Sequence, residues 1–246
     1  MKTLSVMTLN LRFGLAEDGR NGWEYRKEAV ARLFREHGTD FIATQEANDF
    51  QIDYLVRNLP GYKYIGRRHP APRFWQHNIL FYRQAIQCQE QVHFFLSETP
   101  QVPSRSFGSQ FPRQGTLGLF HVHGKPVICL NTHFDFHERA HRGAARVLKQ
   151  QLASYSGKIP AILMGDFNTT PETSCYRWLT GNEENGTVGM DFNETFTKPY
   201  PSTFHGFTGK PVAGHIDWIL FRGTLQLTAC RVEKHSVGGV YVSDHN

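Results

Sequence analysis

The chain has 246 residues, and 39% of them are hydrophobic. That fraction suits a packed core and excludes a disordered chain, while no stretch reaches the ~20 apolar residues that a membrane-spanning helix needs. Lysine and arginine together number 27 against 22 for aspartate and glutamate, which gives a net charge of +5. This positive charge favours an anionic substrate or partner, although solubility alone would also explain it.

The chain shows no linker or internal repeat, which predicts a single domain over residues 1–246. Its four cysteines lie far apart, at Cys88, Cys129, Cys175 and Cys230, so neither a zinc knuckle nor a disulfide framework is supported. The N-terminus enters a strand pattern directly, without the apolar core of a signal peptide. We expect a cytoplasmic protein that acts as a monomer.

Strands and helices alternate in the first third of the chain. Short apolar runs predict buried strands at Leu4–Asn10 and Phe41–Glu46. The helical pattern between them stops at His37, before a glycine. A second helix is predicted over Asp49–Leu59, and residues 62–92 are predicted to form strands around a loop rich in arginine, histidine and aromatic residues.

A long loop precedes the central strands. Ser97–Arg113 is rich in serine, proline and glycine, which is typical of surface loops that carry binding residues. Gly115–His123 and Val127–Phe134 lie on either side of a Gly-Lys pair and predict a hairpin. A helical pattern follows over Ala140–Tyr155.

The last third is again rich in strands. A buried strand is predicted at Ile162–Asp166, a short helix at Thr173–Leu179, and strands at Ile216–Phe221 and Leu225–Val232. Many strands with few helices between them favour two packed sheets covered by helices over a strictly alternating, doubly wound fold.

Polar residues end several of the buried strands. Asp166 and Asn168 follow an apolar run and are two positions apart, so in extended backbone both would face one reacting group. The alternative is a turn, since aspartate and asparagine favour turns and Pro171 follows. Glu46 ends another apolar strand, where a carboxylate needs a cation or a salt bridge to an arginine. Asn10 ends the first strand.

Histidines with neighbouring aspartates form the remaining candidates. His133 and Asp135 share one face of a strand end, and a histidine there is able to move a proton or stabilise a phosphate oxygen. Asp217 and the pair Asp244-His245 give two more such neighbourhoods. With thirteen histidines in the chain, a structural role for any one of them is the alternative.

Taken in order, these motifs resemble the endonuclease/exonuclease/phosphatase superfamily, which includes deoxyribonuclease I and exonuclease III. The resemblance spans essentially the whole chain. It implies an α+β fold, a four-layer α/β/β/α sandwich in which two mixed β-sheets pack face to face with helices outside and the site at one edge. The motifs are Asn10, Gln45-Glu46, Asn131-Thr132-His133, Gly165-Asp166-Phe167-Asn168, Ile216-Asp217 and Ser243-Asp244-His245.

The resemblance also implies a metal site. Glu46 would be the main ligand, with Asn10 and Asp244 completing or orienting the site. Oxygen ligands of this kind suit Mg²⁺, with Mn²⁺ as a substitute, better than a thiolate-seeking metal. Members of the superfamily normally continue past the final Ser-Asp-His motif into a strand, whereas this sequence ends at Asn246, so the last strand is expected to be absent.

Catalytic roles follow from the same resemblance. Asp166 would orient or deprotonate the attacking water, and Asn168 would hold that water and a phosphate oxygen. His245, kept protonated by Asp217, would donate to the phosphoryl oxygen. His133 would stabilise the phosphate from another side or assist the leaving oxygen. The implied activity is Mg²⁺-dependent hydrolysis of a phosphoester.

The substrate is less defined than the reaction. Residues 62–75 interleave basic and aromatic side chains, which is typical of nucleic-acid binding, but the rings are also compatible with a core and the charges with a solvated rim. Arg105, Arg113 and Asp135 are candidates for substrate binding, and Asn78 either positions substrate or starts a strand. A phosphodiesterase or nuclease is the first expectation. A phosphatase, a phospholipid head-group phosphodiesterase and a non-catalytic binding module are the alternatives.

Overall fold

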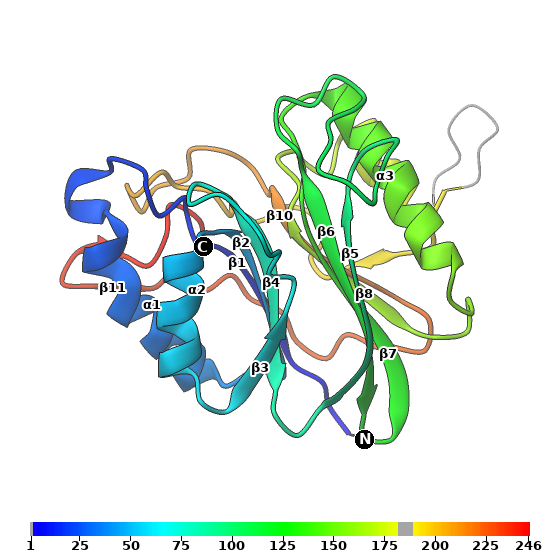
Figure 1. Cartoon of the computed structure of the whole chain (residues 1–246), viewed down its shortest axis with the longest axis horizontal. Coiled ribbons are helices and arrows are strands. Elements are labelled where there is room, and N and C mark those ends of the chain that lie inside the picture. Colours follow the sequence, from blue (N-terminus) through cyan, green and yellow to red (C-terminus); the bar gives the residue numbers. More distant parts are fainter. Residues whose placement is uncertain (1, 182–188) are drawn as a thin grey trace.

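Two β-sheets pack face to face in the computed structural model, which describes residues 2–181 and 189–246 (Figure 1). Helices cover the outer face of each sheet, so that the molecule has four layers. Both sheets contain parallel and antiparallel pairs. This α/β/β/α sandwich confirms the predicted fold class.

The smaller sheet has four strands in the order β1-β2-β4-β3. Strands β1 and β2 are parallel, and β4 is antiparallel to both of its neighbours. Helices α1 and α2 cover its outer face, and the short 3-10 helix η1 leads into α1 (Figure 1). These elements are β1 (Val6–Asn10), η1 (Gly19–Asn21), α1 (Trp23–His37), β2 (Phe41–Ala47), α2 (Asp49–Asn58), β3 (Tyr62–Ile65) and β4 (His77–Arg83).

The larger sheet has six strands in the order β5-β6-β7-β8-β10-β9. Strands β7 and β8 are parallel, while β10 is antiparallel to β8. Helices α3 and α4 pack on its outer face. The elements are β5 (Gln87–Phe95), β6 (Gln114–Val122), β7 (Lys125–His133), α3 (Glu138–Ala153), β8 (Ala161–Asp166), α4 (Ser174–Leu179), β9 (Asn193–Glu194) and β10 (Asp217–Arg222).

Three apolar clusters hold the layers together. Within β2 the side chains alternate, so Phe41 packs between the sheets while Ile42 packs under α1 and α2. Strand β7 shows the same alternation, with Cys129 between the sheets and Leu130 under α3. Alternate apolar residues that are buried on both faces explain why these strands read as continuous apolar runs.

The ends of β2 are set by local backbone signals. Gly38 ends α1 in the left-handed conformation, with φ 54°, and its N–H donates to the carbonyl of Phe34. At the other end, Asn48 and Gln51 form a capping box that starts α2. Glu46, two residues before this cap, is thereby held at the edge of the sheet.

The predicted strand at Leu225–Val232 is wrong, because this segment is irregular in the structure. The outer edge of β10 already pairs with β9, and the side chain of Leu227 stays 45% exposed. Alternating apolar residues form a strand only where a neighbouring strand is free to pair with them. The other predicted strands and helices are present, with ends shifted by a few residues.

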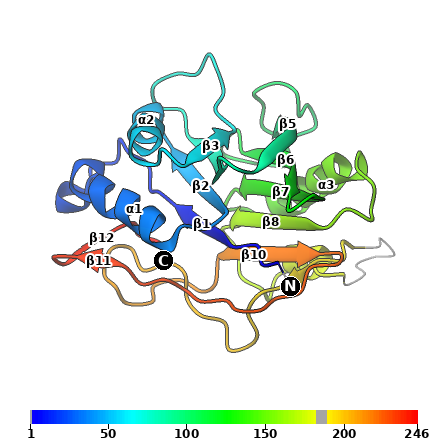
Figure 2. The same ribbon diagram turned by 90° about the horizontal axis from the view of Figure 1, so that it is seen from below.

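A short hairpin follows the irregular segment. It consists of β11 (Ser236–Val237) and β12 (Val240–Tyr241) and lies beside α1 (Figure 2). Among the residues that the structure describes, no helix has the length and apolarity needed to cross a membrane.

Candidate active site

Gly165 allows β7 and β8 to approach closely at the edge of the sandwich. It has φ 147°, and a Cβ atom at this position would lie 1.9 Å from the carbonyl oxygen of Thr132. The parallel register therefore places His133 directly beside Asp166. A glycine is required here because neither this φ nor this distance suits another residue.

A tight turn follows Asp166. Asn168 has φ 49°, and its backbone N–H donates to Oδ1 of Asp166 at 2.9 Å. Its side-chain amide donates to the carbonyl of Phe134 at 3.0 Å. The turn, rather than the extended backbone that we expected, brings both side chains to the same place.

Glu46 leaves the ladder of β2 at a bulge. It has φ 60°, and the register with β4 shifts between Thr44 and Ala47. The backbone N–H of Phe13 donates to Oε2 of Glu46 at 2.6 Å. Among the described residues no lysine or arginine lies within ion-pair distance of Glu46, which leaves the salt-bridge alternative without support.

Asn10 connects two of the carboxylates of the site. Its amide nitrogen donates to Glu46 at 3.1 Å and to Oδ2 of Asp166 at 2.9 Å. Its own oxygen accepts a hydrogen bond from the backbone N–H of Arg12 at 2.9 Å, which fixes the orientation of the amide. Asn10 thus lies at the junction of the two sheets and between two acidic side chains.

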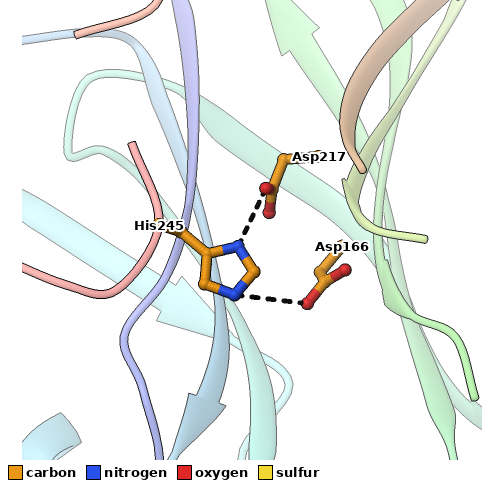
Figure 3. A group of neighbouring side chains, drawn as sticks. All are labelled: Asp166, Asp217 and His245. Atoms are coloured by element: carbon orange, nitrogen blue, oxygen red, sulfur yellow. Dashed lines mark hydrogen bonds and ion pairs between the residues drawn. The ribbon is translucent and has the colours of Figure 1, made fainter. Parts of the chain in front are cut away.

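His245 lies between two aspartates (Figure 3). Its Nδ1 is 2.8 Å from Oδ2 of Asp217, and its Nε2 is 3.9 Å from Oδ2 of Asp166. Burial alone would lower the pKa of this imidazole, but Asp217, Asp166 and Asp244 together outweigh burial and raise the pKa to about 10. The ring is a buried imidazolium at neutral pH.

Asp166 is almost completely buried and lies near a second carboxylate. Burial first, and the charge of Asp217 second, raise its pKa to about 7, while His245 and the hydrogen bond from Asn10 act in the opposite direction. A carboxyl group of this kind accepts a proton near neutral pH more readily than an ordinary aspartate does.

His133, unlike His245, is a neutral imidazole. Nη1 of Arg113 lies 2.9 Å from Nδ1 of His133. Since a guanidinium only donates, Nδ1 accepts and the proton of the neutral ring is on Nε2, 3.4 Å from Asp166. The amide nitrogen of Asn168 is 3.0 Å from the same Nε2, so with this tautomer it donates to the carbonyl of Phe134 and not to the ring. Burial and the charge of Arg113 both lower the pKa of His133 well below its usual value.

The segment 203–206 fixes the positions of the last residues. The backbone N–H of His205 donates to the carbonyl of Asp244 at 2.9 Å, and that of Asn246 donates to the carbonyl of Thr203 at 2.8 Å. Oγ1 of Thr203 also accepts the backbone N–H of Asp217 at 3.0 Å. One segment therefore positions both members of the pair formed by Asp217 and His245.

Two arginines that we did not predict support the site. Nε of Arg12 lies 3.7 Å from Asp244, while its guanidinium forms two hydrogen bonds with Asp18. Arg26, fully buried in α1, donates to the backbone carbonyls of Leu11 and Val242. Only Arg26 left a signal in the sequence, since it occupies a position on the apolar face of its helix.

Gln45 and Asn131, which precede two of the site residues, bond to each other across the sheets. Nε2 of Gln45 donates to Oδ1 of Asn131 at 2.7 Å. The amide nitrogen of Asn131 donates to the carbonyls of Thr44 and Ile79, at 2.9 and 2.8 Å. This amide network lies in the middle of an apolar interface.

The four predicted substrate-binding residues have different surroundings. Arg113 contacts His133 directly. Asp135 is buried and accepts hydrogen bonds from the backbone N–H groups of residues 110 and 111 and from the hydroxyl of Ser109. Arg105 is exposed and donates to a carbonyl of its own loop, and Asn78 is buried in β4, where it donates to the carbonyl of Gln114 at 2.7 Å.

Two groups of residues offer ligands to a metal ion. The ligand atoms of Asp166, Asp217 and His245 lie within 4.8 Å of one another. However, a protonated imidazole has no lone pair for a metal, and Asp217 already binds that ring. The second group is centred on Glu46, which Asn10 contacts; its carboxylate offers oxygen donors without this conflict, and such donors suit a hard divalent cation.

The chain is similar to known proteins in both sequence and structure. The model of the Endonuclease/Exonuclease/phosphatase family matches residues 7–245. An endonuclease/exonuclease/phosphatase from Bacteroides vulgatus has a similar structure, with TM-score 0.86 and 27% identity over 99% of this chain and 95% of that one. A comparison with curated protein sequences gave no match.

Two further structures share the fold at lower identity. The mannosyl-6-phosphatase Bt3783 from Bacteroides thetaiotaomicron VPI-5482 has TM-score 0.82 and 24% identity, over 99% of this chain and 97% of that one. A humanized TDP2 from D. rerio has TM-score 0.70 and 16% identity, over 98% and 95%. The chain belongs to the Endonuclease/Exonuclease/phosphatase family and is a phosphoester hydrolase.

Proposed function

We propose that this chain is a Mg²⁺-dependent hydrolase of small phosphoesters, and that it acts by direct attack of water on phosphorus. One observation carries the proposal. Asp166, a carboxyl group with a raised pKa, lies between a neutral and a protonated histidine. Asp166 would be the base, His133 a neutral hydrogen-bond donor and His245 a cationic one. Such a set suits a reaction in which water loses a proton while negative charge develops on phosphate oxygens.

Glu46, Asn10 and Asp244 would hold the metal ion. All three offer oxygen atoms, and the Glu46 carboxylate is only partly buried, so it is accessible to an ion from solvent. A bound Mg²⁺ would supply charge that stabilises the phosphate. Arg12, 3.7 Å from Asp244, would orient that carboxylate.

The other side chains transfer protons and stabilise negative charge. Asp166 accepts the proton of the attacking water. His245 donates to a phosphoryl oxygen from Nε2, because Nδ1 is held by Asp217. His133 donates to a second oxygen from its own Nε2. Asn168, at the turn beside Asp166, orients the water.

The surroundings of the basic and aromatic segment favour a small substrate over a nucleic acid. Arg67 forms ion pairs with Asp49 and Asp53, at 2.7 and 2.6 Å. The guanidinium of Arg68 stacks over Trp75 at 5.0 Å. These charges already have partners within the chain, so they offer less to a phosphate backbone than the sequence suggested.

Other activities compatible with the fold remain rivals of this proposal. One protein of this fold is a mannosyl-6-phosphatase, and a shared fold does not choose among substrates. A nuclease is the second candidate, because the net charge of +5 favours a polyanion. A non-catalytic binding module is disfavoured, since every principal residue of the motif is present.

The direct test is hydrolysis by the purified protein with Mg²⁺, Mn²⁺ or EDTA. The substrates are bis-p-nitrophenyl phosphate, p-nitrophenyl phosphate, and single- and double-stranded DNA. We expect metal-dependent turnover of a small ester that exceeds any cleavage of DNA. Preferential cleavage of DNA, with steep salt dependence, would favour the nuclease. The absence of turnover with every ester would contradict a hydrolase.

Metal binding has a readout that does not depend on activity. Mg²⁺ should raise the thermal midpoint of the wild-type protein by binding to the folded state. Glu46→Gln should reduce this shift, whereas Glu98→Gln, on an exposed residue of the 97–113 loop, should not. An equal shift in the Glu46 variant would place the ion elsewhere.

A further inference from the structure

Two exposed phenyl rings lie beside the catalytic edge. Phe111 and Phe136 are 45% and 57% exposed, and their centroids are 6.4 Å apart in an edge-to-face arrangement. The guanidinium of Arg113 lies 4.9 Å from the first ring and 5.5 Å from the second. Two large, exposed apolar side chains thus lie over a mostly buried cation, and we call these two rings the phenyl pair.

Asp135 holds the phenyl pair in position. Its Oδ2 accepts the backbone N–H groups of Gln110 and Phe111, at 2.9 and 3.1 Å, and its Oδ1 accepts that of Phe136 at 2.8 Å. One buried carboxylate therefore fixes the backbone beneath both rings. A ligand that contacts rings held in this way loses less free energy to ordering than one that contacts a mobile loop.

Only the side chain of Arg113 lies between the phenyl pair and His133. Arg113 contacts both rings and lies 2.9 Å from His133, which in turn lies 3.4 Å from Asp166. A group attached to a phosphate that accepts a hydrogen bond from His133 would therefore lie near these rings, which Arg113 connects to His133. Exposed rings beside convergent polar groups are typical of ligand sites.

We infer that Phe111 and Phe136 form a subsite for the leaving group, and that this subsite takes a planar aromatic ring such as an aryl group or a nucleobase. This inference rests on the proposed hydrolysis of small phosphoesters at the same edge. Phenyl rings in an edge-to-face pair leave a ring face open for a further stacked or edge-on ring. A saturated or open-chain group gains only apolar contact there.

Binding of phosphonates tests the subsite without turnover. Phenylphosphonate and methylphosphonate differ only in the group attached to phosphorus. Calorimetry in the presence of Mg²⁺ should show that the wild-type protein prefers the phenyl compound by about threefold to tenfold. Phe111→Ala and Phe136→Ala should each remove most of this preference and leave the affinity for methylphosphonate unchanged. Leu227→Ala, at an exposed apolar residue outside the site, should change neither.

A conservative variant separates ring stacking from apolar contact. Phe136→Leu keeps an apolar side chain, so loss of the preference in this variant supports the aromatic subsite. Retention of the preference in both alanine variants, or its absence in the wild-type protein, would overturn the inference. If the wild-type protein hydrolyses no phosphoester but the phenyl preference depends on these rings, the proposed function fails and the subsite stands.

Discussion

Arg113 lies 2.9 Å from Nδ1 of His133, just as Asp217 lies 2.8 Å from Nδ1 of His245. The two partners have opposite charges, and the two histidines have different charge states. Burial and the cation beside it lower the pKa of His133, so this ring is neutral with its proton on Nε2, whereas the carboxylate beside His245 outweighs burial, raises the pKa of that ring and keeps it charged. The site thus contains one neutral and one cationic imidazole donor.

Replacement of Arg113 by methionine should release His133 from this constraint. Without the guanidinium, Nδ1 is free to carry the proton, and the Nε2–H donor is lost from part of the population. We expect kcat to fall about tenfold to a hundredfold with a smaller change in KM. Nitrogen-15 NMR of His133 would report the tautomer, and Arg105→Met, in the same loop, serves as the control. An unchanged tautomer together with unchanged kcat would contradict this role.

Asp166→Asn removes the proposed base while keeping its shape. We expect turnover to fall at least about a hundredfold, because the amide accepts no proton from water. The fold should persist, which circular dichroism would verify. Asp191→Asn, at an exposed aspartate that pairs with Arg222, is the matched control and should retain full activity. Wild-type turnover in the Asp166 variant would rule out the assignment.

The pH dependence of activity follows from two shifted groups. Asp166 loses its proton near pH 7 and must be ionised to act as a base, while His245 must keep a proton that it loses near pH 10. We expect a bell-shaped profile of kcat/KM. Its acid limb should lie at or below pH 7, because a bound cation favours the ionised form of Asp166 and so lowers its pKa. Asp217→Asn should lower the pKa of His245 and move the alkaline limb to lower pH. An alkaline limb that does not move would contradict the pairing.

The same shifts predict how the metal-free protein responds to pH. The pKa of His245 is raised above its ordinary 6.5, so its contribution to stability is complete below pH 6.5 and is lost as pH rises toward 10. The pKa of Asp166 is also raised, so ionisation of this buried carboxyl disfavours the folded state as pH rises from 4 through 7. In EDTA, the free energy of unfolding contributed by these two groups should therefore decrease with pH. Urea titrations of the wild-type protein and of Asp166→Asn between pH 5 and 9 would measure this slope, which should be smaller in the variant.

Gly165→Ala should disrupt the edge at which the site is built. A new Cβ atom would lie 1.9 Å from the carbonyl oxygen of Thr132, so β7 and β8 would have to separate. We expect a loss of about 2 kcal/mol or more in the free energy of unfolding, together with loss of turnover. Gly157→Ala is the control, since no atom lies within 4 Å of its added Cβ. Equal stability of the two variants in urea would contradict this explanation.

The sequence was informative where the signal is local. Apolar runs located β1, β2, β7 and β8, because strands buried on both faces are apolar throughout. The segment Leu225–Val232 shows the limit of this reasoning, since its alternation contains no information about a free partner strand. Asn168 reaches the site through a left-handed turn, the alternative that its residue type favoured over the extended backbone.

Side-chain partners were harder to predict than the site itself. The resemblance in motifs named the candidate residues, but the contact between Arg113 and His133 depends on how a 17-residue loop, Ser97–Arg113, folds back against β7. The same is true of Arg12, which meets Asp244 from the opposite end of the sequence. Contacts between segments so distant in the chain are set by tertiary packing and leave no periodic signal.

The amides of Gln45 and Asn131 have a mechanical consequence. Apolar side chains between two sheets oppose separation but resist sideways sliding only weakly, because such contacts are not directional. Gln45 precedes Glu46, and Asn131 lies two residues before His133, so their 2.7 Å hydrogen bond aligns the proposed metal ligand with the proposed proton-transfer residues. A small sideways displacement of one sheet relative to the other would therefore misalign Glu46 and His133 while the sandwich stays folded.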